Sequence, residues 1–320
     1  MNAQQQGVMG NVDMRTQMAG QNRMEMLIFS LGAGKQKFGI NVFKVREVIH
    51  CPKLADIPHA GSAVIGMASV RGETIPVINL AQATQIPGGI TKADIDPGNP
   101  PLMIVSEYNM RVQAFIVSSV DNIINRSWDQ ITPPPKGLPN GHYLTSVTEV
   151  DNEIIGILDV ERVLAETNTN PDDNFSSAMN EKVEVWKAEH EHEQRVMIVD
   201  DSLVARKQLT KCLEDLGFIV ESFNDGQEAF DHLMAIEGEG GGASQRYKAI
   251  ISDIEMPRMD GYTFVTKLKE LGATQGIRTV LHSSLSGGFN KAMVEKVGAD
   301  GFIEKFSADK LAKFVMELVE

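Results

Sequence analysis

The sequence predicts a multidomain protein in which an all-β N-terminal domain precedes an α/β C-terminal domain. Between residues 24 and 166, many short apolar runs are separated by turn residues, a pattern typical of small β-barrels. From residue 195 to residue 320, apolar strand patterns alternate with helix patterns, which favours a doubly wound sheet of five parallel strands. We expect residues 1–23 to be a disordered polar tail and residues 167–194 to be a linker.

The charge and composition of the chain narrow the classes of partner and compartment. A formal net charge of −13 argues against binding to nucleic acid or to an anionic membrane, since both require basic patches. The two cysteines, Cys51 and Cys212, lie far apart, and this favours a reducing, cytoplasmic compartment. The sequence contains neither a secretory signal nor an apolar run of about 18 residues, so we expect no membrane insertion.

The predicted N-terminal domain consists mainly of strands and tight turns. Residues 26–31 and 37–40 read as strands on either side of a glycine turn. The spacing of apolar residues over 42–49 predicts a short helix. Three hairpins are expected, at residues 70–78 with a turn near Gly72, at 102–117 with a turn at Tyr108-Asn109, and at 147–158 with a turn at Asp151-Asn152.

The predicted linker changes in composition along its length. Residues 167–179 are rich in Asn, Asp and Ser, whereas residues 181–194 are charged and are expected to form a short solvated helix. Two histidines in this stretch, His190 and His192, are two residues apart and would face different sides of a helix. We therefore interpret them as solvent-exposed residues and not as metal ligands.

The C-terminal domain is predicted to contain five strand–helix pairs. The strands are expected at residues 195–199, 218–223, 248–253, 279–283 and 302–304. The helices are expected at residues 202–216, 226–236, 261–271, 288–297 and 307–318. The glycine-rich stretch 237–243 is interpreted as a loop, because the Gly-Lys-Ser/Thr of a phosphate-binding loop does not follow it.

Acidic, hydroxyl and basic residues stand at the end of four of these strands or directly after it: Asp200, Asp201, Asp253, Ser283 and Lys305. Because ligands bind beyond the carboxyl ends of parallel strands, we expect these side chains to lie close together. A magnesium ion would relieve the repulsion between the two adjacent aspartates, with Asp201 as a direct ligand and Asp200 bound through water. Taken alone, the aspartate pair has a second interpretation, since Asp201 or Ser202 could simply cap a helix.

The same residues suit the chemistry of an aspartyl phosphate. An aspartate beside a metal can attack phosphorus and hold the group as a mixed anhydride. Asp253 is the predicted phosphoacceptor and also a predicted ligand of the metal. Ser283 is expected to donate a hydrogen bond to a phosphoryl oxygen. Lys305 is expected to neutralise the charge of the phosphoryl group.

Residues 195–320 resemble a response-regulator receiver domain, which has a flavodoxin-like fold. The matching motifs are the acidic pair, Asp253 within Asp-Ile-Glu-Met-Pro-Arg-Met-Asp-Gly, the hydroxyl of Ser283 and the lysine at 305. The resemblance implies that Glu255 offers its backbone carbonyl to the metal and that Phe302 turns inward on phosphorylation. The chain departs from the family pattern at Phe306, where proline commonly follows the lysine.

Residues 24–166 resemble a CheW-like coupling domain of bacterial chemotaxis. The resemblance rests on Phe38-Gly39-Ile40, Val45-Arg46-Glu47-Val48-Ile49, Ile57-Pro58, Val64-Ile65-Gly66-Met67 and the stretch from Val70-Arg71-Gly72 to Leu80. It implies a double barrel of five strands each that binds chemoreceptors and a histidine kinase and has no catalytic site. Arg71 and Gly72, at a hairpin tip, are the predicted partner-binding residues, because a guanidinium there could anchor a carboxylate.

A coupling domain joined to a receiver is the arrangement of CheV-type chemotaxis proteins. The resemblance implies a non-enzymatic cytoplasmic adaptor at receptor arrays that couples methyl-accepting chemoreceptors to a CheA-type kinase. Phosphorylation of Asp253 would modulate this coupling, in adaptation or as a phosphate sink. The alternative is a magnesium-dependent aspartyl-phosphate phosphatase, but such enzymes usually carry Asp-x-Asp after the first strand, whereas this chain has Asp-Asp-Ser.

Overall fold

The chain folds into two compact units, one from residue 24 to residue 171 and one from residue 172 to residue 320. The computed structural model describes residues 23–32, 36–58, 61, 63–108, 111–135, 137, 143–167, 175–189, 194–238, 240, 242–271, 274–283, 294–305 and 307–319. The predicted tail, except Arg23, lies outside these residues, as do His190, His192 and Phe306. In the described ranges, no helix combines the length and the apolar content that a membrane crossing requires.

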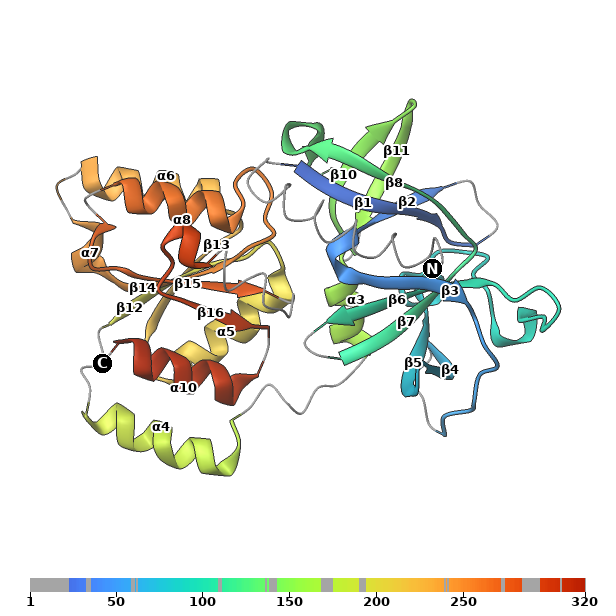
Figure 1. The fold of residues 1–320 in the computed structure, drawn as a ribbon, viewed down its shortest axis with the longest axis horizontal. Helices are drawn as coiled ribbons and strands as arrows, with labels where there is room; N and C mark the ends of the chain where they lie inside the picture. The colour runs from blue at the N-terminus through green and yellow to red at the C-terminus, as the bar shows by residue number, and fades with distance from the viewer. Residues whose placement is uncertain are drawn as a thin grey trace, which may run out of the picture. The chain divides into compact units, whose positions relative to one another are not determined.

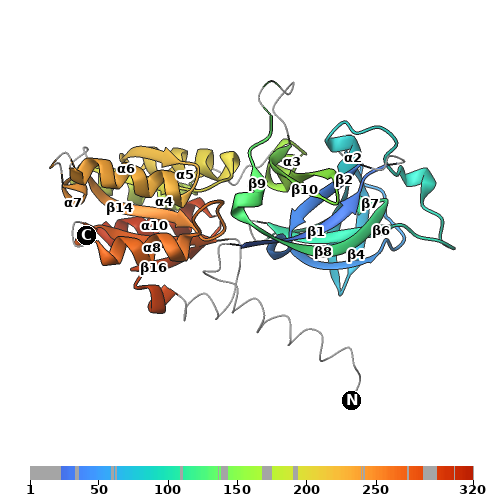
Figure 2. The same cartoon turned by 90° about the horizontal axis from the view of Figure 1, so that it is seen from above.

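The first unit contains two antiparallel-rich sheets. One sheet has the order β8-β1-β2-β11-β10-β9, and its strands are β1 Arg23–Ser30, β2 Lys37–Asn41, β8 Ser119–Ser127, β9 Ile131–Thr132, β10 Leu144–Val150 and β11 Glu153–Leu158. The other has the order β3-β6-β7-β5-β4, and its strands are β3 Val45–His50, β4 Val64–Val70, β5 Glu73–Asn79, β6 Leu102–Tyr108 and β7 Arg111–Val117. Figure 2 shows β1 beside β8 and β6 beside β7.

Strands β1 and β6 of this unit bury side chains on both of their faces. Met26 and Ile28 of β1 pack inside the six-stranded sheet, whereas the alternate residues Leu27 and Phe29 join a core shared with the other sheet. The same alternation occurs on β6, where Met103 and Ile104 lie in different clusters. Each sheet thus encloses its own apolar interior, and the two sheets share a third core between them. The predicted all-β double-barrel class is confirmed.

Two details of this unit differ from the sequence-based expectation. The first sheet has six strands and not five, because Thr132 of the two-residue strand β9 pairs with Val147 of β10. The prediction of a helix at 42–49 was wrong beyond the first turn. A 3-10 helix, η1, spans only Val42–Lys44, and the residues after it form strand β3.

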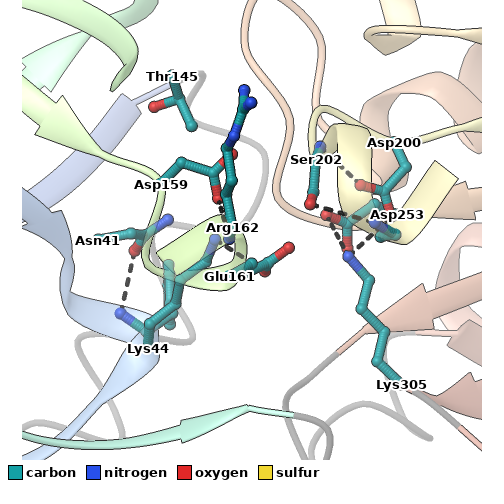
Figure 3. A network of polar contacts seen from close by, with 12 residues as sticks. Asn41, Lys44, Thr145, Asp159, Glu161, Arg162, Asp200, Ser202, Asp253 and Lys305 are labelled. Atoms are coloured by element: carbon teal, nitrogen blue, oxygen red, sulfur yellow. Dashed lines mark hydrogen bonds and ion pairs between the residues drawn. The ribbon is translucent and has the colours of Figure 1, made fainter. Parts of the chain in front are cut away.

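Short helices connect the strands of the first unit, and one of them is held by buried charges. These helices are α2 Leu80–Ala83, η2 Lys92–Asp94, η3 Trp128–Gln130 and α3 Val160–Thr167. Asp159 precedes α3, and its Oδ1 accepts a hydrogen bond from Arg162 N at 3.0 Å. Buried Glu161 pairs with Lys44 Nζ at 2.9 Å, which ties α3 to η1 (Figure 3). Burial, together with the nearby charge of Glu161, raises the pKa of Asp159.

The second unit contains a parallel sheet of five strands in the order β13-β12-β14-β15-β16. The strands are β12 Arg195–Val199, β13 Ile219–Phe223, β14 Tyr247–Asp253, β15 Arg278–Ser283 and β16 Gly301–Glu304. The helices are α5 Leu203–Asp215, α6 Gly226–Gly238, α7 Ala243–Arg246, α8 Gly261–Glu270 and α10 Ala308–Val319. This strand order is that of flavodoxin-like proteins, so the predicted class is confirmed.

Helices cover both faces of the parallel sheet (Figure 1). Helices α5 and α10 pack on one face, over Val196, Ile198 and Ile251. Helices α6 and α8 pack on the other face, over Met197, Val199 and other residues. The predicted helix at 288–297 lies mostly outside the described residues.

The charged stretch before the parallel sheet forms helix α4, Ser177–Glu189, which begins earlier than expected. We predicted a solvated helix here, and that prediction was wrong for one of its faces. Met179, Val183 and Trp186 are buried in the same core cluster as α5 and α10. These residues recur at positions i, i+4 and i+7, so they form one apolar stripe, and the charged residues occupy the remaining surface.

Candidate functional site

The carboxyl ends of four parallel strands bring the predicted acidic and basic residues to one edge of the sheet. Val199 pairs in register with Ser252, and Asp253 pairs with His282, so the strands end at nearly the same level. Asp200 directly follows β12, and Asp253 is the last residue of β14. On the far strand, Lys305 directly follows β16.

The ammonium group of Lys305 lies between two aspartates. Its Nζ is 2.8 Å from Asp200 Oδ2 and 3.0 Å from Asp253 Oδ2 (Figure 3). The lysine is only 3% exposed, and both aspartates are buried as well. A buried charge is tolerated when it is paired and hydrogen-bonded, so these three residues depend on one another.

A third carboxylate completes a cluster that can hold a cation. Carboxylate oxygens of Asp200, Asp201 and Asp253 lie within 4.8 Å of one another. Asp201 is half-buried, so the cluster is accessible from solvent on its side. Carboxylate oxygens are the ligands that Mg²⁺ and Ca²⁺ prefer, and the donor set therefore fits a hard divalent cation.

The start of helix α5 fixes the first of these aspartates. Asp200 Oδ1 accepts a hydrogen bond from Ser202 N at 2.8 Å. Ser202 is the N-cap of α5, and its hydroxyl accepts a hydrogen bond from Ala205 N at 3.3 Å. The capping role that the sequence left open thus belongs to Ser202. The helix cap and the carboxylate cluster are therefore compatible, because the backbone N of the capping serine holds Asp200 in the cluster.

The start of helix α8 fixes the backbone around Asp253. Asp253 Oδ1 accepts a hydrogen bond from Ile254 N at 2.8 Å, and Gly261 N donates to Ile254 O at 2.9 Å. Asp260 caps α8 by accepting from Thr263 N at 2.9 Å. A Cβ atom on Gly261 would lie 2.2 Å from the backbone oxygen of Asp253, so only glycine permits this approach.

The remaining predicted residues of this site lie around the cluster. Ser283 ends β15 and is buried, and its backbone oxygen accepts a hydrogen bond from Lys305 N at 2.8 Å. Glu255, two residues after Asp253, is half-buried. Phe302 of β16 is also half-buried and packs against a small apolar cluster that includes Leu281 and Val294. Ser283 thus lies beside Lys305 on the adjacent strand, Glu255 follows Asp253 in the next loop, and Phe302 precedes Lys305 by three residues.

The sequence-based reasoning missed an ion pair that supports the loop after Asp253. Arg258 has a positive φ of 61°, and its Nε is 2.9 Å from Oδ2 of buried Asp225. Asp225 also accepts hydrogen bonds at the start of α6, from Gln227 N at 2.9 Å and from Glu228 N at 3.0 Å. The signal in the sequence was the Asn-Asp-Gly run that follows β13, which is typical of a capped helix start.

In the first unit, Arg71 and Gly72 form the tip of the β4–β5 hairpin. Both have positive φ, 50° and 87°, as a type I′ turn requires. The Arg71 side chain is 78% exposed, and its guanidinium lies 2.8 Å from Glu47 Oε2 on β3. Sequence reasoning did not assign a role to Glu47. Exposed ion pairs add little stability, so this arginine can exchange its partner at low cost.

Comparison with known proteins agrees with the two-domain architecture. The CheW-like domain family matches residues 25–168, and the response regulator receiver domain family matches residues 196–315. Chemotaxis protein CheV3 of Helicobacter pylori is 31% identical over 288 residues, which cover 88% of each protein. The chain belongs to the CheV family. The chain is also 28% identical to CheV2 of the same bacterium over 309 residues, and this match covers 92% of the chain and 94% of CheV2.

This CheV-family protein is a coupling adaptor in which a CheW-like domain is fused to a receiver domain. That architecture confirms the predicted adaptor function and does not favour the phosphatase alternative. Among solved structures, the scaffolding protein TtCheW from Thermoanaerobacter tengcongensis is 24% identical with a TM-score of 0.38, and the match covers 44% of this chain and 87% of that protein.

Proposed function

We propose that this CheV-family protein links chemoreceptors to a CheA-type histidine kinase, and that phosphorylation of Asp253 changes the strength of that link. The observation that carries the proposal is the position of the Lys305 ammonium, within 3.0 Å of Asp253 and beside a cluster of three carboxylates. The protein acts as an adaptor and phosphoacceptor and not as an enzyme. It works in the cytoplasm, at receptor arrays.

The phosphoryl group reaches Asp253 from a phosphohistidine of the kinase. A carboxylate oxygen of Asp253 attacks phosphorus and forms an O–P bond, while the N–P bond breaks and its electron pair returns to the histidine nitrogen. A bound Mg²⁺ supplies positive charge that offsets the repulsion between the carboxylate and the phosphoryl oxygens. Asp200, Asp201 and Asp253 would hold it with their carboxylates, and Glu255 with its backbone carbonyl.

Three further residues respond to the phosphoryl group. Lys305 pairs with a phosphoryl oxygen in place of the Asp253 carboxylate. Ser283 donates its hydroxyl hydrogen to a second oxygen. Phe302, on the strand before Lys305, turns inward as Ser283 moves. The added charge at Asp253 is a local electrostatic change, and through these three residues it alters the surface of the receiver.

The proposal is tested by reconstituting receptor, kinase and this protein. Kinase output is measured with the unmodified protein and with the protein saturated by Mg²⁺ and beryllofluoride, an analogue of the phosphoryl group. We expect the protein to support receptor control of the kinase, and we expect the analogue to change the degree of control. If receptor control of the kinase is the same with and without the protein, the adaptor proposal is wrong.

Arg71→Glu is expected to weaken kinase or receptor binding about tenfold, which corresponds to roughly 1.4 kcal/mol. The reversed charge removes the guanidinium from the hairpin tip and places a second carboxylate beside Glu47. Binding is measured by pull-down and by titration calorimetry with purified kinase and receptor fragments. Arg23→Glu, an exposed change on β1, serves as the matched control. Equal affinity of the Arg71 variant and the wild type would remove Arg71 from the interface.

A further inference from the structure

Helix α4, which precedes the receiver sheet in the chain, is packed as part of the receiver. Its apolar stripe of Met179, Val183 and Trp186 is buried, and partly buried Phe175 packs on the same cluster just before the helix. The partner surface is formed by α5, by Phe218 and by α10. Figure 1 shows α4 lying along α10 on the side away from the sheet. The receiver therefore carries an additional helix on its α5–α10 face.

Two specific contacts fix the ends of this helix. Near its C-terminal end, the ring centroids of Trp186 and Phe218 lie 5.3 Å apart, and the two rings are tilted by 43°. Near its N-terminal end, Ser176 N donates a hydrogen bond to Asp309 Oδ1 at 2.9 Å. Asp309 lies in the first turn of α10. The position of α10 therefore determines whether α4 can make both contacts at once.

Helix α10 is itself joined closely to the phosphoacceptor site. Its first residue, Ala308, is only three residues after Lys305. Lys305 pairs with both Asp200 and Asp253, and its backbone N donates to Ser283 O. When a phosphoryl group is present on Asp253, Lys305 must exchange at least one of these carboxylates for a phosphoryl oxygen. That exchange acts on the segment that leads directly into the first turn of α10.

We propose that α4 is the output element of the receiver: it is docked on the α5–α10 face in the unphosphorylated protein, and phosphorylation of Asp253 releases it. Because α4 immediately precedes the receiver and follows the coupling domain in the chain, its release changes the tether between the two domains. A helix of 13 residues is marginal in isolation, so α4 remains ordered only while its apolar stripe is covered. This inference rests on the proposed role of Asp253 as the phosphoacceptor.

The chain contains two tryptophans, and this permits a direct test in the full-length protein. Trp186 lies on α4, whereas Trp128 is buried in the coupling domain and serves as an internal reference. The protein is labelled with 5-fluorotryptophan, and Trp186→Phe assigns the two fluorine resonances. On addition of Mg²⁺ and beryllofluoride, the Trp186 resonance is expected to move toward the position of solvent-exposed tryptophan and to acquire a solvent isotope shift.

A pair of valines on α4 gives a matched set of variants. Val183 is 3% exposed and faces the receiver, whereas Val185 is 59% exposed. By linkage, a change that undocks α4 must favour the phosphorylated form, so Val183→Asp is expected to tighten beryllofluoride binding roughly fivefold or more. Val185→Asp is expected to bind beryllofluoride as the wild type does. Asp309→Ala, which removes only the end contact, is a milder second variant expected to shift binding in the same direction.

The outcomes separate this inference from the proposed function. Incorporation of phosphate from acetyl phosphate is measured in the same preparation. If Asp253 becomes labelled but the Trp186 resonance stays unchanged, the release of α4 is wrong and the phosphoacceptor role stands. Unaltered beryllofluoride affinity in both Val183→Asp and Asp309→Ala likewise overturns the coupling. If Asp253 is not labelled at all, the proposed function fails first.

Discussion

Asp253→Asn is expected to reduce incorporation of phosphate from acetyl phosphate, or from the phosphorylated kinase, to background. A carboxamide has almost the shape of a carboxylate, but it lacks the negatively charged oxygen that attacks phosphorus. The substitution also removes one of the two carboxylates that pair with Lys305, while the pair with Asp200 at 2.8 Å is retained. Incorporation is measured with radiolabelled donor and by mass spectrometry of the intact protein.

The control for this experiment is Asp231→Asn, which changes an exposed aspartate on α6. It is expected to incorporate phosphate like the wild type. A circular dichroism melt of each variant shows whether the fold is retained. If the Asp253 variant still incorporates phosphate at the wild-type level, another carboxylate of the cluster is the acceptor and the assignment is wrong.

Gly261→Ala is expected to lower the free energy of unfolding of the receiver by about 3 kcal/mol, a large effect for one methyl group. The new Cβ would lie 2.2 Å from Asp253 O and 2.9 Å from Ile254 Cα, and both are backbone atoms that a side-chain rotation cannot move. Either α8 or the loop after β14 must shift, and both hold the phosphoacceptor. Chemical denaturation measures the stability, and phosphate incorporation measures the function.

The matched control is Gly238→Ala, since a Cβ at this exposed glycine at the end of α6 meets no atom within 4 Å. We expect that variant to unfold at nearly the same denaturant concentration as the wild type. Equal stability of the two alanine variants would mean that the close approach of α8 to Asp253 does not constrain the site.

The acidic edge could be predicted from the sequence because it depends on strand ends. Val199, Ile251 and Leu281 close apolar runs that are followed by polar residues, and parallel strands align such ends on one edge of the sheet. The Asp151–Asn152 and Arg71–Gly72 turns were also foreseeable. Asp, Asn and Gly tolerate the positive φ that such turns require, and each turn contains at least one of them. Local chemistry and topology indicated the same structure in these regions.

The segment after η1 was misread because a bulge mimics helical spacing. Val45 and Val48 both pack against the core shared by the two sheets, although they are three residues apart. A register shift between Val45 and Glu47 places them there, since in a regular strand residues three apart face opposite sides. Apolar residues spaced three positions apart therefore cannot distinguish a helical turn from a bulged strand.

Two other features could not be obtained from local patterns. In α4, charged residues dominate the composition, and they concealed the stripe formed by Val183 and its apolar neighbours. Nothing in the linker itself shows that another element covers this stripe. The pairing of Arg71 with Glu47 joins residues 24 positions apart, one in the β4–β5 turn and the other on β3. Since β3 is adjacent to neither β4 nor β5 in the sheet, only the assembled fold reveals this pair.

The two-residue connection at Arg71 and Gly72 also has a consequence for which sequence changes the coupling domain can accept. The turn sets the pairing of Val70 with Glu73 and of Ala68 with Ile75. Because side chains alternate along a strand, inserting one residue at this tip would send every following side chain of β5 to the opposite face, and buried Ile75 and Val77 would leave the interior that they now share with Met103. This exposed loop should therefore keep its length among related proteins even where its residue types vary.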